Sequence, residues 1–74
     1  MAKIVEVARY CAENIEDWDL KVEQALRDIG RHMPIDYSFR REIEDKAAEW
    51  CDENDVSIDF SDGIDAEEIV LTEI

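Results

Sequence analysis

Three side chains in this sequence are soft metal ligands, of types that can also act as nucleophiles or bases: Cys11, His32 and Cys51. They lie 21 and 19 residues apart, whereas structural zinc sites usually draw their ligands from close pairs such as Cys-x2-Cys. His32 has no obvious nucleophile near it in the sequence. The spacing therefore predicts no metal site and no catalytic residue, and we expect no cofactor.

The acidic segment near the C-terminus offers oxygen ligands of the kind that calcium prefers. A calcium-binding helix–loop–helix motif needs acidic or amide side chains at loop positions 1, 3 and 5, Gly at position 6 and Glu at position 12. If Gly63 takes the Gly position, Ile58 begins the loop and Ile69 stands where Glu is required. A loop that begins at Asp55 instead puts Phe60 at the Gly position. Both registers fail, so these acids predict no dedicated calcium site.

Paired carboxylates could also act as a general acid and base, but 21 acids among 74 residues make such pairs uninformative. The sequence has no Gly-rich phosphate loop and no nucleophile motif. A chain of this length also has little room for an enclosed pocket of several hundred Å³. We therefore expect a protein that is not an enzyme.

Negative charge is concentrated in the C-terminal part of the chain. Residues 47–74 contain ten of the acids and no Lys, Arg or His, whereas residues 1–46 contain eleven acids and eight bases. The formal net charge of −13 repels phosphate backbones and anionic lipids, so we expect neither direct nucleic-acid binding nor membrane binding. A partner protein with a basic or amphipathic surface is favoured instead.

Length and composition predict one small globular domain covering residues 1–74. Apolar residues make up 46% of the chain, which is normal for a folded protein despite the high net charge. No apolar run exceeds three residues, and Glu6 and Arg9 interrupt the N-terminal stretch, so neither a membrane span nor a signal peptide is expected. A cytoplasmic location and reduced cysteines follow as expectations.

Hydrophobic periodicity predicts three helices, at about residues 2–14, 17–29 and 38–54. Asn14 or Asp17 can cap the second helix and Asp36 or Ser38 the third, while Gly30 suits a left-handed helix end. We expect a Glu42–Lys46 ion pair on the third helix. The predicted core takes one apolar stripe from each helix: Ile4, Val7, Ala8, Cys11, Ile15, Trp18, Val22, Leu26, Ile29, Phe39, Ile43, Ala47 and Trp50, with Ile58 or Phe60 covering one end.

The segment after residue 56 is ambiguous. Asp65 followed by Glu68 is typical of a helix start, whereas the β-branched residues that follow favour a strand. The predicted fold is therefore an all-α bundle of three to four helices with a short C-terminal element. The alternative is an α+β fold, in which the tail forms a β-hairpin with residues 56–60.

Acids and apolar tail residues together predict a protein-binding surface. We expect it to dock on a basic or amphipathic partner, or on a second copy of the chain, in which case the basic cluster Arg27, Arg31, Arg40 and Arg41 is a contact. Its predicted residues are Glu49, Asp52, Glu53, Asp59, Asp62, Asp65, Ile69, Val70, Leu71 and Ile74.

An alternative function is nucleic-acid mimicry, with carboxylates standing in for a row of phosphates. It needs acids regularly spaced on one convex face, and competition with nucleic acid that weakens with salt. The acids that could supply the row are Glu42, Asp45, Glu49, Asp52 and Glu53, extended by Asp59, Asp62 and Asp65.

Overall fold

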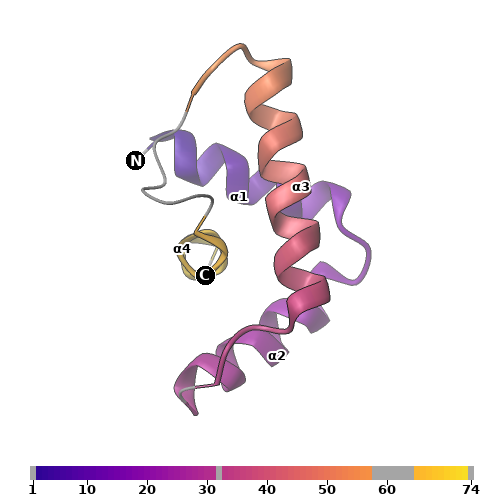
Figure 1. The fold of residues 1–74 in the computed structure, drawn as a ribbon, viewed down its shortest axis with the longest axis vertical. Helices are drawn as coiled ribbons and strands as arrows, with labels where there is room; N and C mark the ends of the chain where they lie inside the picture. The colour runs from indigo at the N-terminus through magenta and orange to yellow at the C-terminus, as the bar shows by residue number, and fades with distance from the viewer. Residues whose placement is uncertain (1, 32, 58–64, 74) are drawn as a thin grey trace.

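The computed structural model describes residues 2–31, 33–57 and 65–73, and these residues form four helices (Figure 1). Helix α1 spans Ala2–Asn14, α2 spans Trp18–Gly30, α3 spans Tyr37–Glu53 and α4 spans Ala66–Thr72. The described residues contain no strand, so the predicted all-α bundle is confirmed. The first three helices lie within one residue of their predicted bounds, because an apolar stripe of period 3.6 specifies them strongly.

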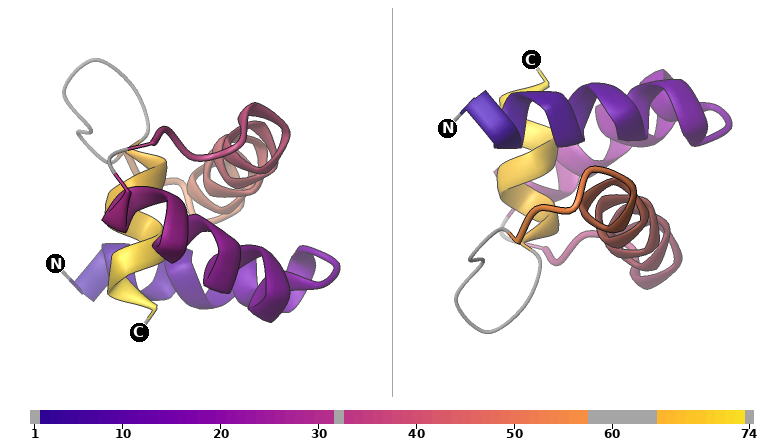
Figure 2. Two further views of the ribbon diagram at one scale, coloured as in Figure 1. Left: turned by 90° about the horizontal axis from the view of Figure 1, so that it is seen from below. Right: turned by 90° about the horizontal axis from the view of Figure 1, so that it is seen from above.

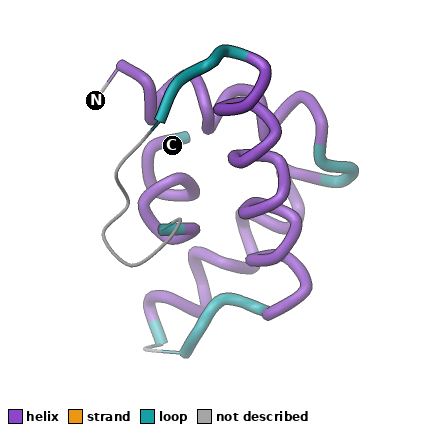
Figure 3. The backbone as a smooth tube through the Cα atoms, turned by 45° about the horizontal axis from the view of Figure 1, so that its top comes forward, coloured by secondary structure: helices purple, strands orange, loops and turns teal. Residues whose placement is uncertain are grey.

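Helix α3 runs along the longest axis of the molecule, and α4 is seen end-on beside it in Figure 1. Helix α4 contacts each of the other three helices, and it runs across α1 in both views of Figure 2. Short loops join α1 to α2 and α2 to α3 (Figure 3). The radius of gyration of 11.5 Å is close to the roughly 11 Å expected for a compact domain of this length.

One core cluster joins all four helices. The Trp18 and Phe39 rings meet edge-on with their centroids 5.5 Å apart, which links α2 to α3. Several predicted core residues are only partly buried at its margin, among them Ile4, Val22, Leu26, Ile29 and Trp50. The buried set is Val7, Ala8, Cys11, Ile15, Trp18, Ala25, Ile35, Phe39, Ile43, Ala47, Ala66, Ile69 and Val70.

The prediction of exposed aliphatic side chains in the tail is wrong for Ile69 and Val70. Both have an exposed fraction of 0% and belong to the core, whereas Leu71 is 50% exposed. Asp65 caps α4 because its Oδ1 accepts the Glu68 backbone N–H at 3.1 Å. Burial against the other helices therefore outweighs the strand preference of these β-branched residues.

The β-hairpin alternative is wrong for residues 66–72, since this segment is helical. Residues 58–60 of its proposed partner strand lie outside the described residues, as do Ile58 and Phe60 of the predicted core. The same holds for His32 and for the predicted partner-binding residues Asp59, Asp62 and Ile74.

Two of the predicted helix ends differ in detail from the structure. Asp36 caps α3 through its side chain as expected, but Asp17 makes no side-chain cap and adopts a left-handed conformation with φ of 58°. Gly30 is the last residue of α2, and Arg31 follows it with φ of −96°. Gly30 therefore does not provide the predicted left-handed helix end.

A left-handed Asp ends α3 instead of a Gly. Asp55 has φ of 53°, and its N–H reaches the Asp52 carbonyl at 3.3 Å while the Val56 N–H reaches the Cys51 carbonyl at 3.0 Å. This pair of bonds is the Schellman motif, in which Gly is the usual left-handed residue. The motif leaves a carboxylate at the negative end of the α3 dipole, where anions are unfavourable.

We expect Ile69→Ala to lower the free energy of unfolding by about 2–5 kcal/mol, because it opens a cavity in the core. The matched control, Leu71→Ala, truncates the half-exposed neighbour and should cost less than about 1 kcal/mol. Urea unfolding followed by far-ultraviolet circular dichroism measures both. Equal losses in the two variants would contradict the placement of α4.

We expect Asp55→Gly to raise the free energy of unfolding by about 1 kcal/mol, because Gly adopts the left-handed conformation without the strain of a side chain. Asp55→Asn is the control that removes only the charge, and it should give a smaller gain. The same urea experiment measures both variants. A lower stability of Asp55→Gly would show that its side chain stabilises the helix end.

Candidate functional site

The acids predicted to bind a partner are all on the surface where the structure describes them. Glu49, Asp52, Glu53 and Asp65 are exposed. So are the other described acids of residues 47–73, namely Asp55, Glu67, Glu68 and Glu73. Among the described residues, Glu49 is the only member of this group in an ion pair, with the Lys46 ammonium at 3.2 Å. The remaining seven are exposed and have no ion-pair partner among the described residues.

Three of these acids cluster where α3 ends, and we call Asp52, Glu53 and Asp55 the α3 acidic end. The last turn of α3 contains no basic residue, so these carboxylates face the carbonyl end of the helix. Each such placement is unfavourable by about 0.3–1 kcal/mol. Helix stability therefore gives no reason for acids at this position.

Glu49 differs from the acids of the α3 acidic end because it forms an ion pair with Lys46. The Lys46 ammonium donates to it, and this bond, followed by that of the Tyr10 hydroxyl, holds the pKa of Glu49 below its usual value. Loss of solvent around Tyr10, then its hydrogen bond to Glu49, and then the charges of Glu49 and Glu53 raise the pKa of Tyr10 to about 12. Glu49 is thus partly neutralised within the chain.

A groove of about 420 Å³ lies between α2 and the start of α3. Its apolar lining comes from Ala25, Ile35 and Phe39, each less than 10% exposed. The polar lining comes from both helices and the residue before α3: Lys21, Gln24, Asp28, Asp36, Ser38 and Glu42. Three carboxylates and one ammonium leave the lining with a formal charge of −2.

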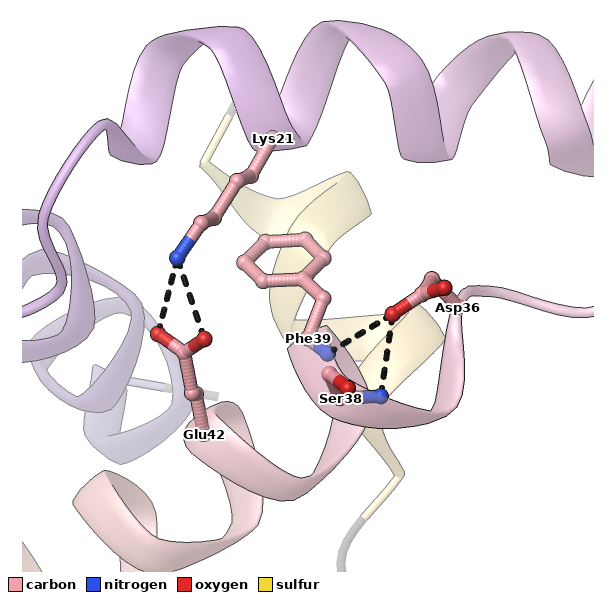
Figure 4. A network of polar contacts seen from close by, with 5 residues as sticks. All are labelled: Lys21, Asp36, Ser38, Phe39 and Glu42. Carbon is pink, nitrogen blue, oxygen red and sulfur yellow. Dashed lines mark hydrogen bonds and ion pairs between the residues drawn. The ribbon is translucent and has the colours of Figure 1, made fainter.

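Figure 4 shows the arrangement of charge around the Phe39 ring, which lies between a Lys21–Glu42 pair and Asp36. The Lys21 Nζ donates to both Glu42 carboxylate oxygens at 3.0 Å. This pair links α2 to α3, and because both side chains are about one-third or more exposed, it contributes at most about 1 kcal/mol. The predicted Glu42–Lys46 pair is not formed. Glu42 pairs with Lys21 of α2, and Lys46 pairs with Glu49.

Asp28 and Asp36 each keep one carboxylate oxygen free within the described part of the chain. Asp36 Oδ1 accepts the Ser38 and Phe39 backbone N–H groups at 3.0 and 3.4 Å. Asp28 Oδ1 accepts from the Gln24 side chain at 2.9 Å. The Oδ2 atoms of both residues can therefore accept hydrogen bonds from a ligand.

The sequence interpretation missed this groove. Lys21, Gln24 and Asp28 follow one another at i, i+3 and i+7 along the margin of the α2 apolar stripe. That spacing places them in one row on the side of the helix. Only the placement of α2 beside the start of α3 shows that the row faces Asp36 and Glu42.

A second, shallower hollow of about 260 Å³ lies between α1 and α3. It is lined by Glu6, Arg9, Tyr10, Glu13, Trp50 and Asn54. Tyr10 is half-buried there. Both signs of charge line this hollow.

Two of the four arginines of the basic cluster are in local ion pairs. Arg27 pairs with Glu23 at 2.7 Å and Arg40 with Glu44 at 3.2 Å, both across one helical turn. Arg41 donates to the Tyr37 hydroxyl at 3.4 Å. Arg31 and Arg41 have no ion-pair partner among the described residues, so local pairs neutralise only half of the charge of the cluster.

Both cysteines are free thiols. Cys11 is completely buried in the core, while Cys51 is half-buried. The described residues contain no group of three or more His, Cys, Asp or Glu placed to hold a metal ion. No helix in the described part of the chain is long and apolar enough to span a bilayer.

Comparison with protein-family models, curated proteins and solved structures gives no significant match to this chain.

We expect alkaline pH to destabilise the protein through Cys11. Burial, followed by the charge of Glu73, raises the pKa of Cys11 from 9.0 to about 12. The folded state therefore retains a proton that the unfolded state releases, so the free energy of unfolding should fall as pH rises from about 9 towards 12. Thermal unfolding at a series of pH values measures this loss.

The Cys11→Ala variant should be less stable at pH 7 but should lose less stability above pH 9. Cys51→Ala removes the half-buried thiol and serves as the control. Tyr10, whose pKa is also raised, leaves some alkaline dependence in every variant. If Cys11→Ala keeps the full wild-type slope, Cys11 is not the responsible group.

Proposed function

We propose that this chain is a non-enzymatic protein-interaction module that binds a basic or amphipathic partner through its C-terminal acids. The observation that carries the proposal is the α3 acidic end. Asp52, Glu53 and Asp55 are exposed, have no ion-pair partner among the described residues, and oppose the dipole of their own helix. A role in attracting a basic partner accounts for exposed acids that reduce the stability of their own helix.

The structure changes the apolar part of the predicted surface. Ile69 and Val70 are core residues, so of the described tail aliphatics only Leu71 can contact a partner. Charge, rather than an apolar patch, therefore supplies most of the proposed attraction. Salt should weaken such binding strongly, because mobile ions screen exposed charges over about 10 Å at 0.1 M.

Nucleic-acid mimicry receives less support. Glu42 is held by the Lys21 ammonium and Glu49 by Lys46, so cations neutralise two of the five α3 acids that would imitate phosphates. A row of phosphates contains no such built-in cations. The mimic stays an alternative, and competition of the chain with nucleic acid for a basic protein would test it.

We expect the triple variant Asp52→Asn, Glu53→Gln, Asp55→Asn to bind a basic partner about tenfold or more weakly than the wild type. The probe is a fluorescently labelled amphipathic helical peptide of Leu and Lys, titrated at about 50 and 500 mM salt. The variant should also unfold at higher urea concentration, because three unfavourable charges are removed. This gain rules out misfolding as the cause of weaker binding.

The matched control removes the same charge from exposed acids in the other half of the chain, Glu13→Gln, Glu16→Gln and Asp19→Asn. It should keep most of the wild-type affinity. Equal weakening in both triple variants would show that net charge alone attracts the peptide, and it would contradict the proposal. If only the first triple variant binds weakly, affinity capture from the native host with the wild type and both variants as baits would identify the natural partner.

A further inference from the structure

We infer that the groove between α2 and α3 receives an arginine side chain of the basic partner. This inference rests on the proposed function, since it names the group of the partner that this groove would bind. The groove is separate from the α3 acidic end, because its residues come from α2, from the linker before α3, and from the first turns of α3.

The shape and chemistry of the groove match the two parts of an arginine side chain. Its lining includes the apolar residues Ala25, Ile35 and Phe39, which suit the three methylene groups of the stem. Its volume of about 420 Å³ lies at the low end of the range found for ligand sites. The groove is partly open to solvent, so a side chain from another protein could enter.

Charge complementarity fixes the sign of the occupant. The lining carries a formal charge of −2, and Asp28 and Asp36 each offer one oxygen without a donor in the described residues. The one ammonium, Lys21, already donates to both oxygens of Glu42. A cation that enters the groove thus meets free carboxylate oxygens on one side and a neutralised pair on the other.

Arginine fits this arrangement better than lysine. A guanidinium is planar and weakly hydrated, and it presents several N–H donors. It can therefore lie over an apolar lining while it donates to a free aspartate oxygen. An ammonium is compact and strongly hydrated, so it loses more solvation over an apolar lining.

The test is a titration of the ¹⁵N-labelled full chain with Nα-acetyl-arginine methylamide at low salt. We expect saturable shifts of the backbone amide signals of Ala25, Ile35 and Phe39. The corresponding lysine amide should bind at least about threefold more weakly. Shifts that do not saturate, shifts spread over all surface acids, or equal affinity for both amides would overturn the inference.

Two charge-matched variants separate the groove from general electrostatics. Asp28→Asn with Asp36→Asn should weaken arginine-amide binding about tenfold, and the fold is preserved because Asn caps a helix as well as Asp does. Asp52→Asn with Glu53→Gln removes the same charge elsewhere and should leave the groove shifts intact. Equal effects of the two variants would also overturn the inference.

The peptide experiment distinguishes failure of this inference from failure of the proposed function. The probe is an amphipathic peptide in which Arg replaces Lys, titrated against both double variants. If only the Asp52/Glu53 variant weakens peptide binding, the groove takes no arginine although the proposed function stands. If neither variant weakens it, both proposals fail.

Discussion

The fold depends on the burial of one short helix against three longer ones. Helix α4 has seven residues, too few to be stable in water by itself, yet Ala66, Ile69 and Val70 are almost completely buried. A domain of 74 residues has a thin core, and these three side chains fill the space enclosed by α1, α2 and α3. The tertiary contacts thus decide both that the segment is helical and that the bundle closes.

Closure of the core also determines where the charge lies. No polar or charged side chain among the described residues is buried, so the acids of α3 and α4 all remain in solvent. Those near helix N-termini, such as Glu67 and Glu68, interact favourably with the dipole of α4. Those of the α3 acidic end oppose the dipole of α3. Similar acids thus have opposite effects on stability, and only the second group lacks a structural explanation.

Much of the fold could be predicted because its signals are local. The stripes of α1, α2 and α3 repeat over 13 to 17 residues, which is long enough to specify a helix and its buried face. Helix α4 could not be assigned with equal strength, since its β-branched residues favour a strand and its helical state depends on distant contacts. Ile35 was missed for a related reason: it precedes α3 and belongs to no stripe, yet it is buried.

The candidate site was less predictable, because its contacts join residues far apart in the sequence. The exposure of Asp52 and Glu53 follows from their positions on α3, whereas the Lys21–Glu42 pair connects residues separated by 21 positions. The i, i+4 spacing on α3 predicted an ion pair of Glu42 with Lys46 instead. The same non-local packing creates the groove, whose lining residues have no common motif.

The two proposed contacts differ in physical character and would act at different stages of binding. Exposed, unpaired acids act over roughly a Debye length, so the α3 acidic end would mainly raise the rate at which a basic partner approaches. The groove acts only at contact distance, through carboxylate oxygens beside an apolar lining. It would therefore set which side chain is bound and how slowly it leaves. A partner with scattered lysines would satisfy the first contact alone, whereas a partner with one correctly placed arginine would satisfy both.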